Sequence, residues 1–430
     1  MNESIFNTSA YKRSRRAYTL ECAFEYFISL MVADAFLATL LSEMGMGDAI
    51  IGVISSLISL AFLFQLFSIF IVQHIRNVKA VAIPIHCVSQ MFFLFLYLLP
   101  FFDIPKHFRA VVVVGCLLIA YFGNYLVTSL IFNWGNAYVD PNGRASFAAT
   151  KEIVSLLSGI TVSLLMGQAI DLFMETGNIR GGFLFIAVMM LLINIGDFIC
   201  LMLIKNQKQE KKTQEKAEPF WQVVWMLFAN KSFVCTVIVH AIWSISVYMT
   251  VGFMGTYKTK ELFLSVSLVQ IINIAACLAR ALFSKPIARY ADKHSYANGI
   301  SLGMVIAAVS YLVNIFTTPS LRWLVIVHTV LYHVSCAGTS QNLINLTYSY
   351  VDKKYFVQAS AIKYSISGLC GFAASMVGSS ILDAVQNGGN ALFGVTVYGQ
   401  QILSAISLII VLIGIIFVKA VMEKQTIIAK

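Results

Sequence analysis

Charged residues are scarce in this 430-residue chain. They make up 12% of the sequence, and 59% of the residues are hydrophobic, whereas about 25% charged residues is usual for a soluble domain. This shortage excludes an ordinary soluble protein and indicates an integral membrane protein. The net charge of +10 is compatible with a nucleic-acid-binding protein, but no basic face with interleaved aromatic residues is present, so no nucleic-acid partner is expected.

Several motifs are also missing. The eight cysteines occur singly inside apolar runs, and no CxxC pair is present; we therefore expect packing residues and neither a metal nor another cofactor. No HExxH or Walker A pattern occurs, so the sequence predicts no enzyme and no ATP-driven pump. The first apolar run is not followed by a small-residue cleavage site, and no cleavable signal peptide is expected.

Long apolar runs dominate what is present. A helix of about 20 apolar residues crosses a bilayer, and isolated strands cannot, because their backbone groups would stay unpaired in lipid. The sequence therefore predicts an all-α polytopic membrane protein with twelve transmembrane helices. The predicted spans are 20–42, 49–72, 80–102, 110–134, 146–173, 182–204, 233–256, 263–284, 297–317, 321–346, 358–382 and 398–418.

One long charged segment, 205–219, separates spans six and seven and reads as a solvated linker. The following "FWQVVWMLF" (220–228) predicts a short helix at the membrane interface, anchored by Trp221 and Trp225. We therefore expect an N-terminal six-helix bundle over 1–204, a cytoplasmic linker with the interfacial helix over 205–230, and a C-terminal six-helix bundle over 231–430.

The basic residues predict the orientation. With the N-terminus inside, cytoplasmic segments carry 20 of the 30 lysines and arginines, and the outer loops carry six. This bias favours a cytoplasmic (inner or plasma) membrane location with both termini cytoplasmic. The four remaining residues lie within or at the edge of spans: Lys151, Lys231, Arg280 and Lys363.

The sequence contains an internal repeat. Residues 133–171 align without a gap on 345–383, with eleven identical pairs among 39. The shift equals six spans, so the two copies keep the same orientation and the repeat is parallel. Both copies carry small residues at every fourth position, beginning at Ser155 and Ser367, which favour close helix contact. Lys151 and Lys363 lie at the foot of these ridges, where each either extends to the interface or takes part in contacts between the bundles.

These features resemble the major facilitator superfamily. The segment "SKPIARYADKHSYANG" (284–299), with Arg289, Asp292 and Lys293, is similar to the family's cytoplasmic loop between the second and third helices of a half. The first-half counterpart, "IVQHIRNVKA" (71–80), lacks the usual acidic residue. The resemblance implies a secondary transporter built from two parallel-repeat six-helix bundles, with a central substrate cavity and alternating access.

Charges inside spans are functional candidates, because burying a charge in a bilayer costs at least about 2.5–3.5 kcal/mol. Asp34 and Glu25 in span one are candidate proton-coupling residues; either can instead be a carboxylate hydrogen-bonded within the bundle. Nine positions separate them, about 180° around a helix. Asp197 in span six is a weaker candidate, since the family places that helix at the periphery.

Two further charged residues could close the cytoplasmic side of the transporter as a gate. Arg280 lies about one turn inside the cytoplasmic end of span eight, and Glu152 lies at a similar depth in span five. The family packs these spans together, so an Arg280–Glu152 pair is a candidate cytoplasmic gate. Alternatively, Arg280 binds lipid headgroups or the loop containing Asp292.

Polar stripes predict which spans line the cavity. Their residues recur at helical spacing on one face, and such a stripe needs water or polar partners in a membrane. The candidates are Tyr121, Asn124, Tyr125 and Thr128 in span four; His240 and Trp243 in span seven; Gln270 and Asn273 in span eight; and His328, Tyr332, Ser335, Thr339 and Asn342 in span ten.

The sequence thus predicts a secondary active transporter that moves a small organic solute by alternating access. Proton coupling, sodium coupling and uniport all stay open. The amides and aromatic residues suit a neutral polar or amphipathic solute such as a sugar, and Asp34 suits a cationic one. The alternative is a membrane-embedded enzyme or flippase acting on a lipid-linked substrate, although most loops are short for such a site.

Overall fold

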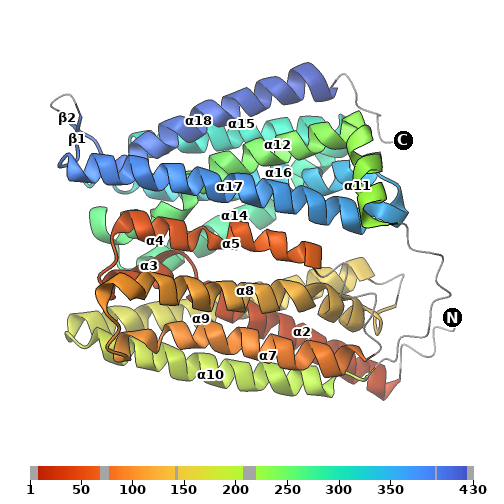
Figure 1. Ribbon diagram of the computed structural model, residues 1–430, viewed down its shortest axis with the longest axis horizontal. Helices are drawn as coiled ribbons and strands as arrows, with labels where there is room; N and C mark the ends of the chain where they lie inside the picture. The colour runs from red at the N-terminus through yellow and green to blue at the C-terminus, as the bar shows by residue number, and fades with distance from the viewer. Residues whose placement is uncertain (1–7, 68–76, 141–143, 207–218, 393–394, 424–430) are drawn as a thin grey trace. The chain divides into compact units, whose positions relative to one another are not determined.

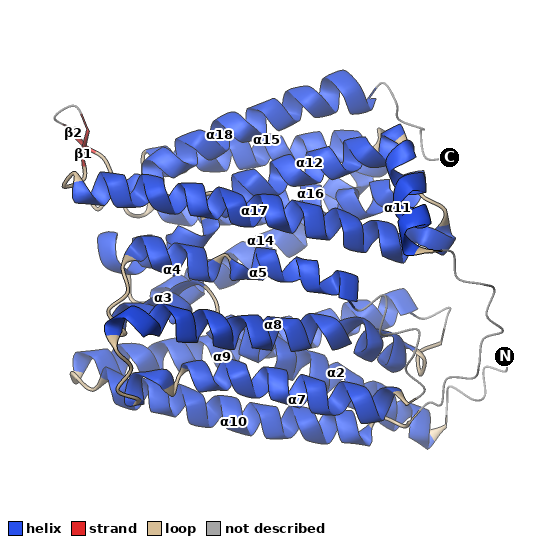
Figure 2. Cartoon of the chain, viewed as in Figure 1, coloured by secondary structure: helices blue, strands red, loops and turns tan. Residues whose placement is uncertain are grey.

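The computed structural model describes residues 8–67, 77–140, 144–206, 219–392 and 395–423, and these are almost entirely helical (Figures 1 and 2). The strands β1 (Ala391–Leu392) and β2 (Val395–Thr396) form one short antiparallel ladder that pairs Ala391 with Thr396. Contacts within the chain divide it into two compact units. Unit 1 comprises Met1–Gly45 and Phe67–Glu215, and unit 2 comprises Met46–Leu66 and Lys216–Lys430.

Unit 1 is built from long helices. They are α2 (Ser9–Met31), α3 (Asp34–Glu43), α7 (Val78–Leu96), α8 (Lys106–Asn136), α9 (Arg144–Glu175) and α10 (Ile179–Leu203), with the 3₁₀ turn η2 (Leu99–Phe101) after α7. Helix α2 packs on α9 and α10, while α7 packs on α8 and α10. Tyr18, Leu130, Trp134 and Leu201 belong to one buried cluster, so side chains from α2, α8 and α10 share a core.

Unit 2 contains the remaining helices. They are α4 (Asp48–Ser55), α5 (Leu57–Ala61), η1 (Phe62–Phe64), α11 (Phe220–Ala229), α12 (Lys231–Tyr248), η4 (Val251–Phe253), α13 (Met254–Thr256), η5 (Tyr257–Glu261), α14 (Val266–Lys293), α15 (Tyr296–Ile315), α16 (Leu324–Tyr350), η6 (Lys353–Tyr355), α17 (Phe356–Asn387), α18 (Gly399–Phe417) and η7 (Val418–Met422). Helix α12 packs on α17 and α18, and α15 packs on α16 and α18 (Figure 1).

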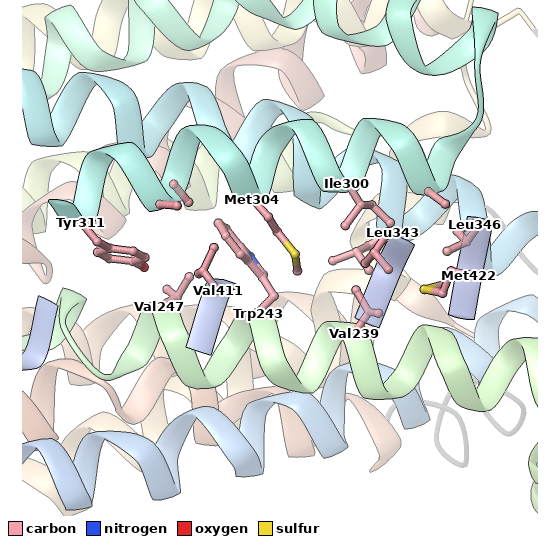
Figure 3. Packing of buried hydrophobic residues seen from close by; sticks show 14 residues of the cluster. Val239, Trp243, Val247, Ile300, Met304, Tyr311, Leu343, Leu346, Val411 and Met422 are labelled. Carbon is pink, nitrogen blue, oxygen red and sulfur yellow. The ribbon is translucent and has the colours of Figure 1, made fainter. Parts of the chain in front are cut away.

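Large apolar side chains fill the space between these helices. Figure 3 shows Trp243 of α12 close to Met304 of α15 and Val411 of α18, and all three are buried. Tyr311 lies in the same cluster, and its hydroxyl donates to the Ser246 carbonyl oxygen at 3.2 Å. Its polar end is therefore satisfied within the bundle, as a buried tyrosine requires.

The second predicted span packs within unit 2, although it comes from the first half of the chain. Helix α4 contacts η4 and α17, and α5 contacts α17. Two glycines allow the approach. A Cβ at Gly52 would collide with the Phe253 ring, and a Cβ at Gly368 would collide with the Ser59 carbonyl oxygen. Any larger residue at either position would force these segments apart.

The structure confirms an all-α fold with many membrane-spanning helices. Ten described helices are long and apolar enough to cross a bilayer, or eleven if the bent pair α2 and α3 forms one span. Helix α16 has 27 residues, long enough at about 1.5 Å per residue, but it is not among those that pass by apolar composition. The count of twelve stays a prediction. The predicted short helix after the linker is confirmed as α11, with Trp221 and Trp225 71% and 77% exposed.

Candidate functional site

Three titratable side chains meet inside unit 1. Glu21 comes from α2, His86 from α7 and Asp197 from α10, and each residue is only 1% exposed. Helix packing brings them together, since α10 contacts both α2 and α7. Of the three residues, only Asp197 was predicted from the sequence as a functional candidate. Glu21 and His86 interrupt apolar runs and so carried a signal, but their pairing depends on helix contacts that the sequence does not reveal.

The cluster is hydrogen-bonded on one side only. His86 Nε2 lies 2.8 Å from Asp197 Oδ2, and the Cys22 thiol donates to Glu21 Oε2 over 3.2 Å. Glu21 Oε1, His86 Nδ1 and Asp197 Oδ1 are buried without a hydrogen-bond partner within the described part of the chain. One donor atom from each of the three residues lies within 4.8 Å of the others. Within the described residues, this is the cluster that could hold a metal ion.

The two predicted coupling carboxylates lie elsewhere in unit 1. Asp34 begins α3 just after a break at Val32–Ala33, where the chain bends by 46° between α2 and α3. Its φ of 44° is in the left-handed region, which is strained for a residue with a Cβ. Glu25 lies half-buried on α2. The bend interrupts the continuous helix on which the expected 180° separation rests, and the coupling role of both residues stays a prediction.

The two duplicated lysines have different partners. Lys151 of α9 is half-buried; its Nζ donates to the Tyr18 hydroxyl at 3.2 Å and lies 4.6 Å from the Tyr18 ring centroid. Lys363 of α17 is fully buried, and its Nζ donates to the Leu343 carbonyl oxygen at 3.1 Å and to Thr347 Oγ1 at 2.9 Å. Lys363 is thus held by α16 within its own unit. The inter-bundle role proposed for both stays a prediction.

The predicted gate residues lie in different units. Arg280 of α14 is exposed in unit 2, as are Arg289 and Asp292 near the end of the same helix. Glu152 belongs to α9 of unit 1, and its side chain lies outside the described set. The gate therefore stays a prediction.

The span-ten stripe is buried on α16. His328, Ser335, Thr339 and Asn342 are each at most 4% exposed, while Tyr332 is half-buried. Ser310 of α15 donates to the His328 carbonyl oxygen at 2.8 Å, and a Cβ at Gly303 of α15 would collide with Thr339. In this structure the stripe supplies close contact and hydrogen bonds between α15 and α16. Its predicted cavity-lining role is untested.

The other cavity candidates are distributed over three helices. On α8, Tyr121 is buried, Asn124 and Tyr125 are half-buried, and Thr128 is exposed. On α12, the His240 ring meets the Tyr364 ring edge-on at a centroid distance of 5.0 Å, and Trp243 lies in the apolar core. On α14, Gln270 is buried and Asn273 is half-buried. These positions remain candidates for solute contact.

A cavity of about 390 Å³ lies in unit 1, beside the segment that connects α7 to α8. Its lining includes Glu43, Asp103, Arg109 and Arg180, together with residues of η2. Arg109 is engaged locally, since its guanidinium donates to the Ile104 and Met44 carbonyl oxygens at 2.9 and 2.6 Å. None of the residues predicted from the sequence lines this cavity.

The chain is thus a polytopic bundle of membrane-spanning helices whose sequence carries an internal repeat. The family model "Major Facilitator Superfamily" matches residues 152–375, just over half of the chain. The chain belongs to the Major Facilitator Superfamily. A comparison with curated protein sequences gives no match.

Solved structures share the fold along nearly the whole chain. The nucleoside transporter NupG has a TM-score of 0.70 at 13% identity, with 98% of this chain and 100% of that chain covered. A bacterial homologue of the human lysosomal transporter Spinster gives 0.67 at 14% identity, covering 96% and 97%. A bacterial metal transporter gives 0.63 at 12% identity, covering 96% and 98%. At these identities the likeness concerns the fold alone, and the protein is a multi-pass membrane protein with a transporter fold.

Proposed function

We propose that this protein is a secondary transporter that carries a small organic solute across the cytoplasmic membrane by alternating access, with both termini cytoplasmic. The observation that carries the proposal is a transporter fold shared over 98% of the chain with NupG, together with the family match. The parallel repeat of 133–171 in 345–383 agrees with it, because duplicated bundles are how such carriers expose one site to either side.

The proposed solute is neutral and polar or amphipathic. The half-buried Asn124, Tyr125 and Asn273 carry amide and phenol groups that suit hydrogen bonds to such a solute. Sugars fit this chemistry, and nucleosides, the solutes of NupG, belong to the same class. Organic cations form the second group to be screened, because Asp34 could meet a positive charge.

Protons or sodium ions are proposed as coupling ions, with Asp34 and Glu25 as the carboxylates tested first. Neutral variants separate coupling from transport. If Asp34 couples proton entry, Asp34→Asn keeps solute exchange and loses accumulation driven by a pH gradient. Unchanged gradient-driven accumulation in both Asp34→Asn and Glu25→Gln would remove these two residues from the proposal.

The gate is proposed as an attraction between Arg280 and Glu152 that forms on the cytoplasmic side and breaks during transport. Reversing either charge alone, by Arg280→Glu or Glu152→Arg, replaces the attraction with repulsion, and we expect at least a tenfold loss of transport. The double exchange should restore most of it in a vesicle uptake assay. A double variant as inactive as the single variants would argue against the pair.

The solute is sought first by ligand stabilisation. A ligand that prefers the folded state raises the apparent melting temperature of the purified protein, so sugars, nucleosides and organic cations are screened in turn. Hits then enter counterflow in proteoliposomes without ATP. Accelerated exchange of labelled solute supports the carrier. Product formation from a lipid-linked substrate, or lipid scrambling without solute exchange, would favour the alternative enzyme or flippase.

A further inference from the structure

A group of buried hydrogen-bond acceptors is left unpaired between α2, α7 and α10. We name Glu21, His86, Gln90, Asn194 and Asp197 the polar seam. Gln90 lies one helical turn beyond His86, and Asn194 lies three residues before Asp197, so each shares a face with its neighbour. The Asn194 amide donates to the Gln90 carbonyl oxygen at 3.4 Å, which joins the two pairs across α7 and α10.

Each residue of the polar seam has one buried side-chain atom without a hydrogen-bond partner within the described residues: Glu21 Oε1, His86 Nδ1, Gln90 Oε1, Asn194 Oδ1 and Asp197 Oδ1. When His86 donates its Nε2 hydrogen to Asp197 at 2.8 Å, Nδ1 keeps a lone pair. All five atoms are then acceptors. Unpaired acceptors in a dry interior are costly, and a concentration of them favours a bound cation.

The carboxylates of the polar seam also favour a bound cation. Within the described residues, neither Glu21 nor Asp197 forms an ion pair with a lysine or arginine, and His86 is the only basic partner. Lys151, the lysine that reaches α2, is engaged on the Tyr18 hydroxyl and ring. When both carboxylates are ionised and His86 is neutral, as metal binding requires, the site carries two negative charges at very low exposure. A single added proton would cancel one charge and supply one donor, whereas a divalent ion cancels both.

We propose that the polar seam binds one divalent transition-metal ion, through Glu21, His86 and Asp197. Two carboxylates and an imidazole form a mixed oxygen and nitrogen set, which suits Mn²⁺, Co²⁺ or Zn²⁺ better than the all-oxygen preference of Ca²⁺ and Mg²⁺. One ion with bonds of about 2.0–2.2 Å places its ligands about 3–4.4 Å apart, and the three donor atoms, within 4.8 Å of one another, need only a small shift to meet this. His86 would bind through Nε2, the nitrogen that faces Asp197, and the ion would replace the hydrogen that these two atoms share. The Gln90 and Asn194 amide oxygens lie one turn away as polar support. The site belongs to unit 1 alone and does not depend on the identity of the solute.

Metal binding is tested on the full-length purified protein. After equilibration with Mn²⁺, Co²⁺ or Zn²⁺ and removal of free ion, elemental analysis should find one equivalent, and bound Co²⁺ should show d–d absorption bands. We expect Glu21→Gln, His86→Gln and Asp197→Asn each to weaken binding more than tenfold. The controls Glu175→Gln, at the exposed end of α9, and His107→Gln, also exposed, should bind like the unaltered protein.

A second measurement guards against variants that fail to fold. The metal should raise the melting temperature of the unaltered protein and of both controls, and this rise should vanish in Asp197→Asn even where that variant melts cooperatively without metal. The proposal is overturned if the unaltered protein retains no stoichiometric ion, because the polar seam then holds only protons. It is equally overturned if the three variants retain the ion, which would mean adventitious surface binding. Loss of solute transport alone would bear on the proposed function and leave this test unaffected.

Discussion

At the residue scale, buried charges in this protein are held by neutral polar groups of neighbouring helices. Lys363 is the clearest case: it is 0% exposed and its Nζ donates to Leu343 and Thr347 of α16. The ring of Tyr364 lies 4.9 Å from the same nitrogen and adds a cation–π contact. A lysine that looked like a functional charge in the sequence is therefore also a structural tie between α17 and α16.

Removing one of these partners should be costly. Thr347→Val keeps the shape of the side chain but leaves the Lys363 ammonium with one acceptor fewer, and an unsatisfied buried donor costs about 1–3 kcal/mol. We expect a lower melting temperature in a thermal denaturation assay. The control Thr161→Val, at an exposed position on α9, should melt like the unaltered protein. An equal loss in both variants would show that the Lys363 contact contributes nothing specific.

The backbone at Asp34 gives a second test at this scale. Since its φ is 44°, residues that tolerate the left-handed region should be accepted and β-branched residues should not. We expect Asp34→Asn and Asp34→Gly to melt near the unaltered protein, whereas Asp34→Val should be destabilised by about 1–2 kcal/mol. A Val variant as stable as the Gly variant would mean that α2 and α3 form one continuous helix in the membrane.

The sequence predicted which residues are unusual but not which residues meet. Lys151, Lys363 and Asp34 stood out because they interrupt apolar runs. Glu21 and His86 interrupt such runs as well, but their importance comes from the contact between α2, α7 and α10. The span-ten stripe shows the converse, because its helical period was visible and its neighbour, α15 with Gly303 and Ser310, was not.

At the element scale, α4 is tied to the rest of unit 2 by polar contacts at its first residue. Asp48 Oδ1 lies 2.5 Å from Lys260 Nζ of η5, and Gln386 of α17 donates to Asp48 Oδ2 at 3.1 Å. These contacts join three segments that are far apart in the chain. They form where α4 begins, while Gly52 one turn later allows the close approach to η4.

A double-mutant cycle measures the interaction energy between Asp48 and Lys260. Asp48→Asn removes the charge attraction, and because the Lys260 side chain is 39% exposed, we expect a loss of only about 1 kcal/mol. In a protein of this size that corresponds to roughly 1–2 °C in melting temperature. Lys260→Met should cost a similar amount, and the double variant should lose little more than either single one. Fully additive losses would show that the two residues do not interact.

Helix existence was predictable at this scale, and helix continuity was not. Apolar length predicted nearly every described helix, including α11, because burial of about 20 apolar residues leaves few alternatives in a bilayer. The break at Val32–Ala33 has no proline or glycine to announce it. The polarity of α16 explains why it falls below a purely apolar criterion although its length suffices for a span.

At the scale of the whole molecule, the repeat and the family fold were visible in the sequence, because an ungapped match of 133–171 with 345–383 survives strong compositional bias. The grouping of Met46–Leu66 with the second unit was not visible, because chain order alone assigned that segment to the first half. Its contacts with α17 depend on small residues such as Gly368 on a helix more than 300 positions away. Solute identity depends on side-chain geometry that neither the repeat nor the fold determines.

Alternating access is the central claim, and distances between spin labels on the two units test it most directly. The labels are placed on a variant in which the native cysteines are replaced. One pair joins Thr176, just after α9, to Asn387, the last residue of α17. The other pair joins Lys205, just after α10, to Lys293, the last residue of α14. Adding the solute found by counterflow should lengthen the distance in one pair and shorten it in the other. Distances that stay unchanged in both pairs while solute is being exchanged would contradict the account.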